Sequence, residues 1–458
     1  MLGGAVVGDV RDNSSTFYNP AALGFIENNM LSISANAYNL GYFKMKDALG
    51  DGVDVHKYPF LIYPQMIGGF VPFAKNQKWK WGYSLITRNT SNFTIFSRYA
   101  DTRDAIKNIK GDEKFVAGYE IQSQKQEQWA GITTGRKINK HWSFGTTMNI
   151  AYKTVHGSER VFYKAFPETD TPEDINGNPV DFYIAKLGED RFYDIPIVNI
   201  IWKVGLAAEY GDWRFGFTST LPAINLGFMN FGESQRELEA SNISLNIEGT
   251  DYFLTDYLEI GRQKDNLTRA KTPLSFATGI SKKFSKGKIL FSTEYFFPVE
   301  THNLVDANNS DFESTPGFTL EREPNLNVSE AYKAVLNVSL ALEYQVMENW
   351  NLLTSVRTDF NNHEDVVYSD EPPIEPYYSP WDLYHFTIGA EHVGNKSNLT
   401  AGLQYTLGTG TAEQYQNFTD PNNSTLAGIL NPTLGDMTYL YQGFNIIISY
   451  TYKFKDPE

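Results

Sequence analysis

The chain has 458 residues, of which 41% are hydrophobic and 15% aromatic, and its net charge is −15. It has no apolar run near the roughly 18 residues that a membrane helix needs, which excludes a helical membrane protein. The acidic charge argues against a nucleic-acid partner, because phosphate binding needs basic patches. The absence of cysteine excludes disulfides and thiolate metal sites.

The first 29 residues form a segment without strand-like alternation. It begins with Met1-Leu2-Gly3-Gly4, which lacks the basic start and apolar core of a signal peptide, so we expect the numbering to begin inside a precursor. A glycine-containing run follows over 3–9, and later comes Asn19-Pro20-Ala21. Pro20 fixes φ and ends local pairing, which allows the segment to turn into a strand.

The remainder of the chain alternates apolar residues with polar or small ones, as the lipid-facing and lumen-facing positions of a transmembrane strand do. Leu336 and Val338, for example, alternate with Asn337 and Ser339. This pattern predicts about fourteen antiparallel strands, near residues 30–43, 60–74, 79–99, 115–138, 142–165, 192–210, 213–228, 273–284, 288–305, 334–347, 350–361, 383–394, 398–410 and 437–454.

Short polar turns join these strands on one side, often before a tryptophan, and seven long loops join them on the other. Short turns, long loops and boundary aromatics are typical of transmembrane β-barrels in the outer membrane of Gram-negative bacteria. A barrel in lipid must close, so we expect residues 30–454 to form one closed barrel with both chain ends periplasmic, followed by a short tail over 455–458.

The predicted final strand places Phe444, Ile446, Tyr452 and Phe454 on one face. Such an aromatic-ended strand resembles the signal by which the outer-membrane assembly machinery recognises its clients. We therefore expect that machinery to be a partner during biogenesis, and outer-membrane lipid to surround the finished barrel.

The longest predicted loop, about 229–272, carries an apolar stripe that includes Tyr252, Phe253 and Tyr257, and its spacing predicts a short amphipathic helix starting near Asp251. The loop over 166–191 adds Phe182 and Tyr183. An apolar stripe on an outer loop must be covered. The two alternatives are packing between loops and a hydrophobic ligand held between them.

The predicted lumen face is charged. Arg88 and Arg357 are candidate ligand anchors, because guanidinium groups pair bidentately with carboxylates. The alternative is a lattice of ion pairs that braces the N-terminal segment against the barrel wall. The predicted lumen set comprises Arg88, Lys153, Lys203, Glu209, Arg214, Glu294, Glu343, Arg357, Asp359 and Glu391.

Pro64, Gly68 and Gly69 lie in the second predicted strand, where they weaken pairing with the third strand and predict a lateral gap in the wall. Asp174, Asn176 and Asn178 resemble the start of a calcium loop, but the glycine is misplaced and the twelfth position lacks glutamate, so calcium stays an open alternative to a solvated loop. No catalytic grouping is recognisable, and we expect no enzyme activity.

The N-terminal segment, with Asn19-Pro20-Ala21 just before the first strand, resembles the hatch of the FadL-like family of outer-membrane transporters for fatty acids and other hydrophobic compounds. The resemblance implies a plug inside the lumen, with Asn19 and Pro20 within the barrel and Asn19 bonded to strand or plug backbone. It implies passive uptake of hydrophobic molecules and a sideways exit between strands. Some FadL-like barrels do not transport and serve as subunits of secretion or assembly complexes with other outer-membrane proteins, which is the alternative function.

Overall fold

The computed structural model describes residues 1–27, 29–71, 78–106, 108–247, 250–308, 312–316, 325–368, 372–378, 380–420 and 433–454. Within these ranges, no helix is both long enough and apolar enough to cross a membrane. The predicted tail over 455–458 and the end of the strand predicted at 60–74 lie outside the described residues.

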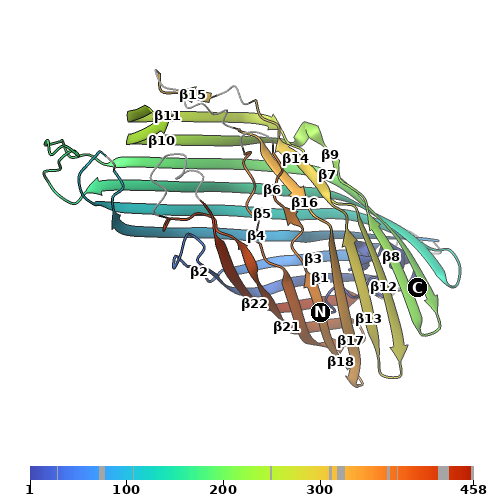
Figure 1. Ribbon diagram of the computed structural model, residues 1–458. Coiled ribbons are helices and arrows are strands. Elements are labelled where there is room, and N and C mark those ends of the chain that lie inside the picture. The colour runs from blue at the N-terminus through green and yellow to red at the C-terminus, as the bar shows by residue number, and fades with distance from the viewer. Residues whose placement is uncertain are drawn as a thin grey trace.

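Fourteen antiparallel strands close into a barrel, as predicted (Figure 1). In ring order they are β1 (Met30–Lys46), β3 (Phe60–Val71), β4 (Trp79–Arg103), β5 (Glu113–Lys137), β6 (Trp142–Pro167), β7 (Ala185–Tyr210), β8 (Trp213–Thr220), β12 (Ser275–Phe284), β13 (Gly287–Phe296), β17 (Val335–Met347), β18 (Trp350–Asp359), β20 (Leu383–Val393), β21 (Ser397–Glu413) and β22 (Asp436–Lys453).

The barrel closes where its first and last strands meet. Met30 pairs with Lys453 at one end of this seam and Lys46 pairs with Thr438 at the other, with one bulge near Asn36. The closed ring satisfies the backbone groups that an open sheet edge would leave without partners in lipid. Outward side chains are apolar and exposed, as Ile388 and Leu403 show at 57% each, so the exterior has the surface that a barrel in a bilayer requires.

Strands β4 to β7 are much longer than the others, with 25 or 26 residues each. A membrane strand needs only about 9–11 residues, so these four strands continue well beyond the apolar band. Their extension is widened by β10 (Phe231–Ile247) and β11 (Thr250–Leu267), since β7 pairs with β8 near the turns and with β10 at its other end (Figure 1).

The hairpin of β10 and β11 corrects the prediction of a helix near Asp251. Around Tyr257, burial alternates with period two, because Tyr257 and Glu259 are buried whereas Leu258 is exposed. Spacing alone did not distinguish this pattern from a helical one. Pairing with β10, in which Ala240 lies opposite Tyr257, selects the strand.

A small three-stranded sheet consists of β14 (Val299–Val305), β16 (Val328–Tyr332) and β19 (His363–Glu364). The strand predicted at 288–305 therefore divides into β13 and β14, because Pro298 between them has no N–H for the ladder. Every residue of β16 is buried. Its Glu330 lies 3.5 Å from Lys153 of β6, which joins this sheet to the inner wall.

Six short elements complete the described structure. The predicted strand 213–228 ends early as β8 and continues into two of them. The six are β2 (Val55–Lys57), β9 (Ile224–Asn225), β15 (Phe312–Ser314) and the 3-10 helix η2 (Gly227–Met229), together with the helical pair α1 (Ser15–Tyr18) and η1 (Pro20–Phe25) of the N-terminal segment.

Candidate functional site

The N-terminal segment, residues 1–27, lies within the ring of strands. Asn13 donates to the carbonyl of Gly68 in β3 at 2.6 Å, and Thr147 of β6 donates to the carbonyl of Thr16 at 2.9 Å. On another side of the ring, Ser355 of β18 donates to the carbonyl of Met1 at 2.9 Å. Contacts to strands this far apart in the ring place the segment in the lumen.

Asn19 joins the segment to itself and to the wall. Its buried Nδ2 donates to the carbonyls of Val7 at 2.9 Å and Leu206 at 3.1 Å, and its Oδ1 accepts from the backbone N–H of Ala21. Pro20 follows at the first position of η1, where the missing N–H costs nothing. The asparagine thus caps one helix and fixes the segment against β7.

Glycines of the wall make room for this turn. A Cβ at Gly145 would collide with the carbonyl of Pro20, one at Gly205 with Asn19, and one at Gly216 with the carbonyl of Val7. Gly145 and Gly205 lie directly opposite each other on β6 and β7. The close approach of two backbones therefore requires residues without side chains at these positions.

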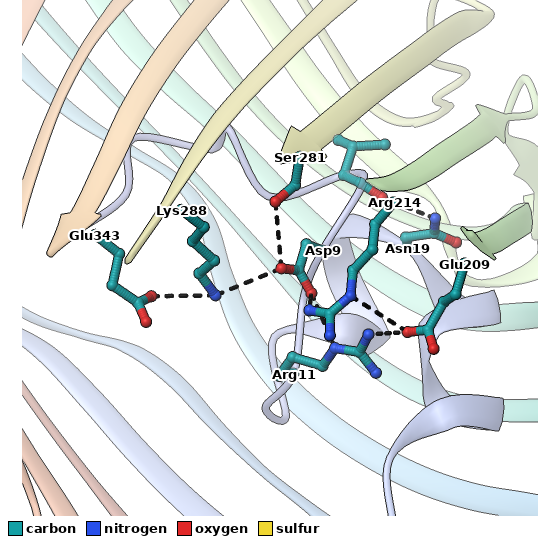
Figure 2. Close-up of polar contacts among 9 residues, drawn as sticks. Asp9, Arg11, Asn19, Glu209, Arg214, Ser281, Lys288 and Glu343 are labelled. Atoms are coloured by element: carbon teal, nitrogen blue, oxygen red, sulfur yellow. Dashed lines mark hydrogen bonds and ion pairs between the residues drawn. The ribbon is translucent and has the colours of Figure 1, made fainter. Parts of the chain in front are cut away.

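Asp9 is the centre of an ion-pair network between the segment and the wall (Figure 2). Its fully buried carboxylate is bonded to Arg11 at 2.9 Å and to Arg214 of β8, and it lies 3.6 Å from Lys288 of β13. Burial acts to raise the pKa of Asp9, but the charges of Lys288, Arg214 and Arg11 outweigh it and lower the pKa.

The network extends around the wall. Arg11 and Arg214 both pair with Glu209 of β7, and Lys288 also pairs with Glu343 of β17 at 3.1 Å. Of these residues, Glu209, Arg214 and Glu343 belong to the predicted lumen set. Asp9, Arg11 and Lys288 were not predicted; the only signal for Asp9 was an acidic residue closing an otherwise apolar, glycine-containing run.

Arg88 and Arg357 both approach the α1 end of the segment. The guanidinium carbon of Arg88 lies 5.7 Å from the ring centroid of Phe17 and 6.0 Å from that of Trp129. Arg357 is 3.8 Å from Asp359. Burial raises the pKa of Tyr18, whereas the charges of Arg357 and then Arg88 lower it, so both cations act on this one tyrosine.

The predicted gap residues separate into two groups. Gly68 and Gly69 pair with Ser84 and Tyr83 of β4, so the expectation that they interrupt the ladder is wrong. Their small size has other uses: the carbonyl of Gly68 accepts from Asn13, and the ring of Tyr83 covers Gly69.

Pro64 lies where the ladder is absent. Pairing between β3 and β4 ends at Met66 and Ile86, whereas β3 continues to pair with β1 as far as Phe60. We name residues 60–65 of β3 and 87–92 of β4 the unpaired interval. Farther along β4, Phe93 stacks on Phe43 of β1 at 5.3 Å and bounds this interval.

The predicted loop residues do not join the two arginines. Tyr257 is 3% exposed and belongs to a cluster of buried side chains that includes Leu187. Tyr183 packs against this cluster. Contacts between loops therefore account for the burial of Tyr257. Phe182 is 52% exposed. The side chains of Tyr252 and Phe253 lie outside the described residues.

The predicted calcium turn is closed by its own hydrogen bonds. Asp174 accepts from the backbone N–H groups of Asn176 and Asn178, each at 2.8 Å, and from the side chain of Asn178 at 2.9 Å. Among the described residues, no group of three His, Asp or Glu side chains is arranged to hold a metal ion. Calcium at this turn stays a prediction.

No protein-family model matches the sequence, and no curated protein matches it. Solved structures do match. A FadL homologue of Pseudomonas aeruginosa is 13% identical with a TM-score of 0.55, and the alignment covers 99% of this chain and 96% of the other. The chain has the FadL-like fold. The toluene transporters TodX of P. putida (12% identity, TM-score 0.54, 97% and 95% coverage) and TbuX of Ralstonia pickettii (10%, 0.53, 99% and 97%) share this fold.

Proposed function

We propose that this FadL-like barrel is an outer-membrane channel for passive uptake of hydrophobic molecules, plugged by its N-terminal segment, and not an enzyme. The apolar exterior supports a location in outer-membrane lipid. The two ends of the barrel sequence lie together beside a short turn, since Phe454 donates to the carbonyl of Asn29 and Lys453 to that of Lys396. This arrangement supports periplasmic termini.

One observation carries the proposal: the β3–β4 ladder stops at Met66 and Ile86 although both strands continue. Unpaired backbone in a membrane wall is costly, and it is tolerated where it borders protein or a cavity. We propose that a hydrophobic molecule leaves the lumen sideways through the unpaired interval. The plug below it blocks passage along the barrel axis.

Cross-linking across the unpaired interval tests this route. If the ladder continued in register, Ile62 would face Thr90, so the pair Ile62→Cys and Thr90→Cys spans the interval. The sequence has no cysteine, so a thiol-reactive cross-linker reacts only with the two introduced residues. The control pair, Ile67→Cys and Leu85→Cys, lies opposite within the ladder.

A short bismaleimide joining positions 62 and 90 is expected to abolish uptake of a labelled hydrophobic compound by intact cells, and the control cross-link is expected to leave uptake unchanged. Equal uptake with both cross-links would exclude the sideways route. Equal uptake by cells with and without the protein would exclude the channel function itself.

The long strands favour a second candidate function, that of an adaptor subunit in an outer-membrane complex. The sheet of β4 to β7, β10 and β11 projects beyond the apolar band and offers a polar outer face. Arg160 and Asp190 on this face are ion-paired but about half exposed. Copurification in mild detergent distinguishes the functions: a stoichiometric complex with other outer-membrane proteins, without uptake, would support the adaptor.

A further inference from the structure

A proline-rich segment in the connection from β18 to β20 crosses the barrel from one wall to the other. We name its residues 372–378 and 380–381 the outer strap; positions 372, 373, 376 and 380 are proline. The backbone N–H of Tyr377 donates to the Tyr193 hydroxyl of β7, and its carbonyl accepts from the Ser123 hydroxyl of β5, each at 3.1 Å. In the ring of fourteen strands β5 is the fourth and β18 the eleventh, so the strap spans the lumen.

The strap lies on the loop side of the lumen, away from the short turns. Tyr193 pairs with Gly157 of β6, which is five residues beyond the outward-facing and exposed Tyr152. The N-terminal segment meets the same strand nearer the turn, where Thr147 donates to the carbonyl of Thr16. The lumen therefore has two closures in series, the N-terminal segment towards the turns and the strap towards the loops.

Glu330 of β16 connects the strap to the wall. Its buried carboxylate lies 3.5 Å from Nζ of Lys153 on β6 and accepts a hydrogen bond from the hydroxyl of Tyr378 in the strap. Burial acts to raise the pKa of Glu330, but the charge of Lys153 and further donors and cations outweigh it and lower the pKa. Its Oε1 has no hydrogen bond within the described residues. A buried carboxylate that is only partly satisfied is costly, so the closed strap depends closely on the ion pair with Lys153.

The strap and β16 are joined as one unit. The backbone N–H of Ser329 donates to the carbonyl of Ile374 at 3.0 Å, and that of Ile374 donates to the carbonyl of Asn327 at 2.8 Å. The four prolines fix φ and stiffen the strap. Its other contacts with the far wall are the two hydrogen bonds of Tyr377 and the stacking of that ring on Phe93 of β4 at 4.4 Å. Neutral hydrogen bonds are individually weak, so the pair of Glu330 and Lys153 is the main attachment.

We propose that the outer strap is the entry gate of the channel and that Glu330 is its latch. The strap leaves Ser123 and Tyr193 when a hydrophobic molecule enters from the loop side, and the N-terminal segment stays in place. The inference rests on the proposed channel function. The Asp9 network that holds the N-terminal segment shares no residue with the contacts of the strap, so either closure opens without the other.

A reversible lock tests the gate in intact cells. Ser123→Cys and Tyr377→Cys are joined by a short bifunctional methanethiosulfonate, which a reducing agent removes. The lock is expected to abolish uptake of a labelled hydrophobic compound, and reduction is expected to restore it. The control pair is Gln122→Cys and Ser158→Cys, which lie opposite each other on the outer face of β5 and β6. Locking this pair is expected to leave uptake unchanged.

Labelling of Ser123→Cys alone tests the latch. Ser123 is 4% exposed beneath the strap, so a membrane-impermeant maleimide reaches this position only when the strap opens. Glu330→Gln is expected to accelerate labelling by about 100-fold, because it leaves Lys153 buried without a counter-ion. Adding Lys153→Met to Glu330→Gln is expected to slow labelling again, since no unpaired charge remains. General damage to the fold would not be repaired by a second substitution.

The matched control is Glu259→Gln, which changes another buried glutamate that accepts a hydrogen bond from a tyrosine, Tyr257, at 2.9 Å. It is expected to leave labelling of position 123 unchanged. Heat-modifiability on gels verifies that each variant forms a folded barrel.

Two results would overturn the inference: uptake that continues while positions 123 and 377 are locked, or Glu330→Gln that labels no faster than Glu259→Gln. If the lock has no effect but cells with the protein still take up more than cells without it, the channel function stands and only the gate fails. If cells with and without the protein take up equally, the channel function fails, and the labelling rates still decide whether Glu330 holds the strap.

Discussion

The N-terminal segment meets the two sides of the barrel in different ways. Towards β8 and β13, buried Asp9 is held by Arg214 and Lys288 in a network of charges. Towards β1 and β3, Asn13 donates neutral hydrogen bonds to Ser32 at 3.0 Å and to the carbonyl of Gly68 at 2.6 Å. The strong anchor is therefore remote from the unpaired interval, and the weaker contacts lie beside it.

The largest expected effect comes from Asp9→Asn, which leaves Arg214 and Lys288 without their shared carboxylate. Breaking a buried ion pair costs about 3–5 kcal/mol. Ser15→Cys supplies a reporter thiol, because Ser15 is buried and its Oγ has no hydrogen-bond partner among the described residues. The rate at which this thiol is labelled in urea measures how firmly the segment is held, and Asp9→Asn is expected to increase it.

The control for this change is Asp54→Asn, which breaks the partly exposed pair of Lys44 and Asp54. Solvent screens exposed ion pairs, so they contribute little to stability, and labelling of the reporter thiol is expected to stay the same. If Asp9→Asn and Asp54→Asn behave alike, charge does not hold the segment.

Acid provides a second way to weaken the ion pairs that Asp9 makes with Arg214 and Lys288. The pKa of Asp9 is lowered from its ordinary value of 3.8, so the folded state binds this proton less readily than the unfolded state does. The stabilisation is complete above pH 3.8 and is lost as the pH falls through the lowered pKa. The reporter thiol reacts more slowly in acid, because the thiolate is its reactive form, so its labelling rate is compared at each pH with the rate in Asp9→Asn. The variant is expected to label faster from neutral pH down to about pH 4, and the ratio of the two rates is expected to approach one below it.

Gly216→Ala, on β8, is expected to loosen the N-terminal segment less than Asp9→Asn does. The added methyl group collides with the carbonyl of Val7, and overpacking costs about 1–3 kcal/mol. Planar-bilayer conductance is expected to rise as the segment shifts. Gly188→Ala is the control, because its nearest neighbour is the flexible side chain of Glu239. Equal conductance in both variants would contradict close packing at Gly216.

Asn13→Ala is expected to have the smallest effect on stability, about 1 kcal/mol for neutral hydrogen bonds. Because Asn13 lies beside the unpaired interval, the substitution is expected to increase uptake while the labelling rate of the reporter thiol changes little. Uptake that falls or stays constant would show that this side of the segment does not limit passage.

The barrel was predictable from sequence because lipid imposes a period of two on every strand, and Leu336 to Ser339 illustrate the rule. The β10–β11 hairpin was not predictable, because above the bilayer both faces of a strand can be polar. The spacing of apolar residues around Tyr257 suited both the strand period and the helix period. The position of β14 was missed because the signal of Pro298 is a single residue inside an otherwise continuous pattern.

The site was only partly predictable. The lumen positions of Asn19 and Arg88 were predicted from residue type and position, whereas Asp9 and Lys288 lie far apart in the sequence and meet only through folding. Gly68 and Gly69 were assigned to a gap because glycine weakens strands in general. Asn13 donates a hydrogen bond to the carbonyl of Gly68, and the ring of Tyr83 covers Gly69. No sequence pattern indicates such compensation.

The seam between β1 and β22 has a consequence for how the protein is made. Since Met30 needs Lys453 as its partner, the first strand keeps a bare edge until the last strand has been synthesised. A ribosome that stalls anywhere before the final strand releases a chain that cannot seal itself. Completion of translation is thereby built into the requirements for closing the barrel.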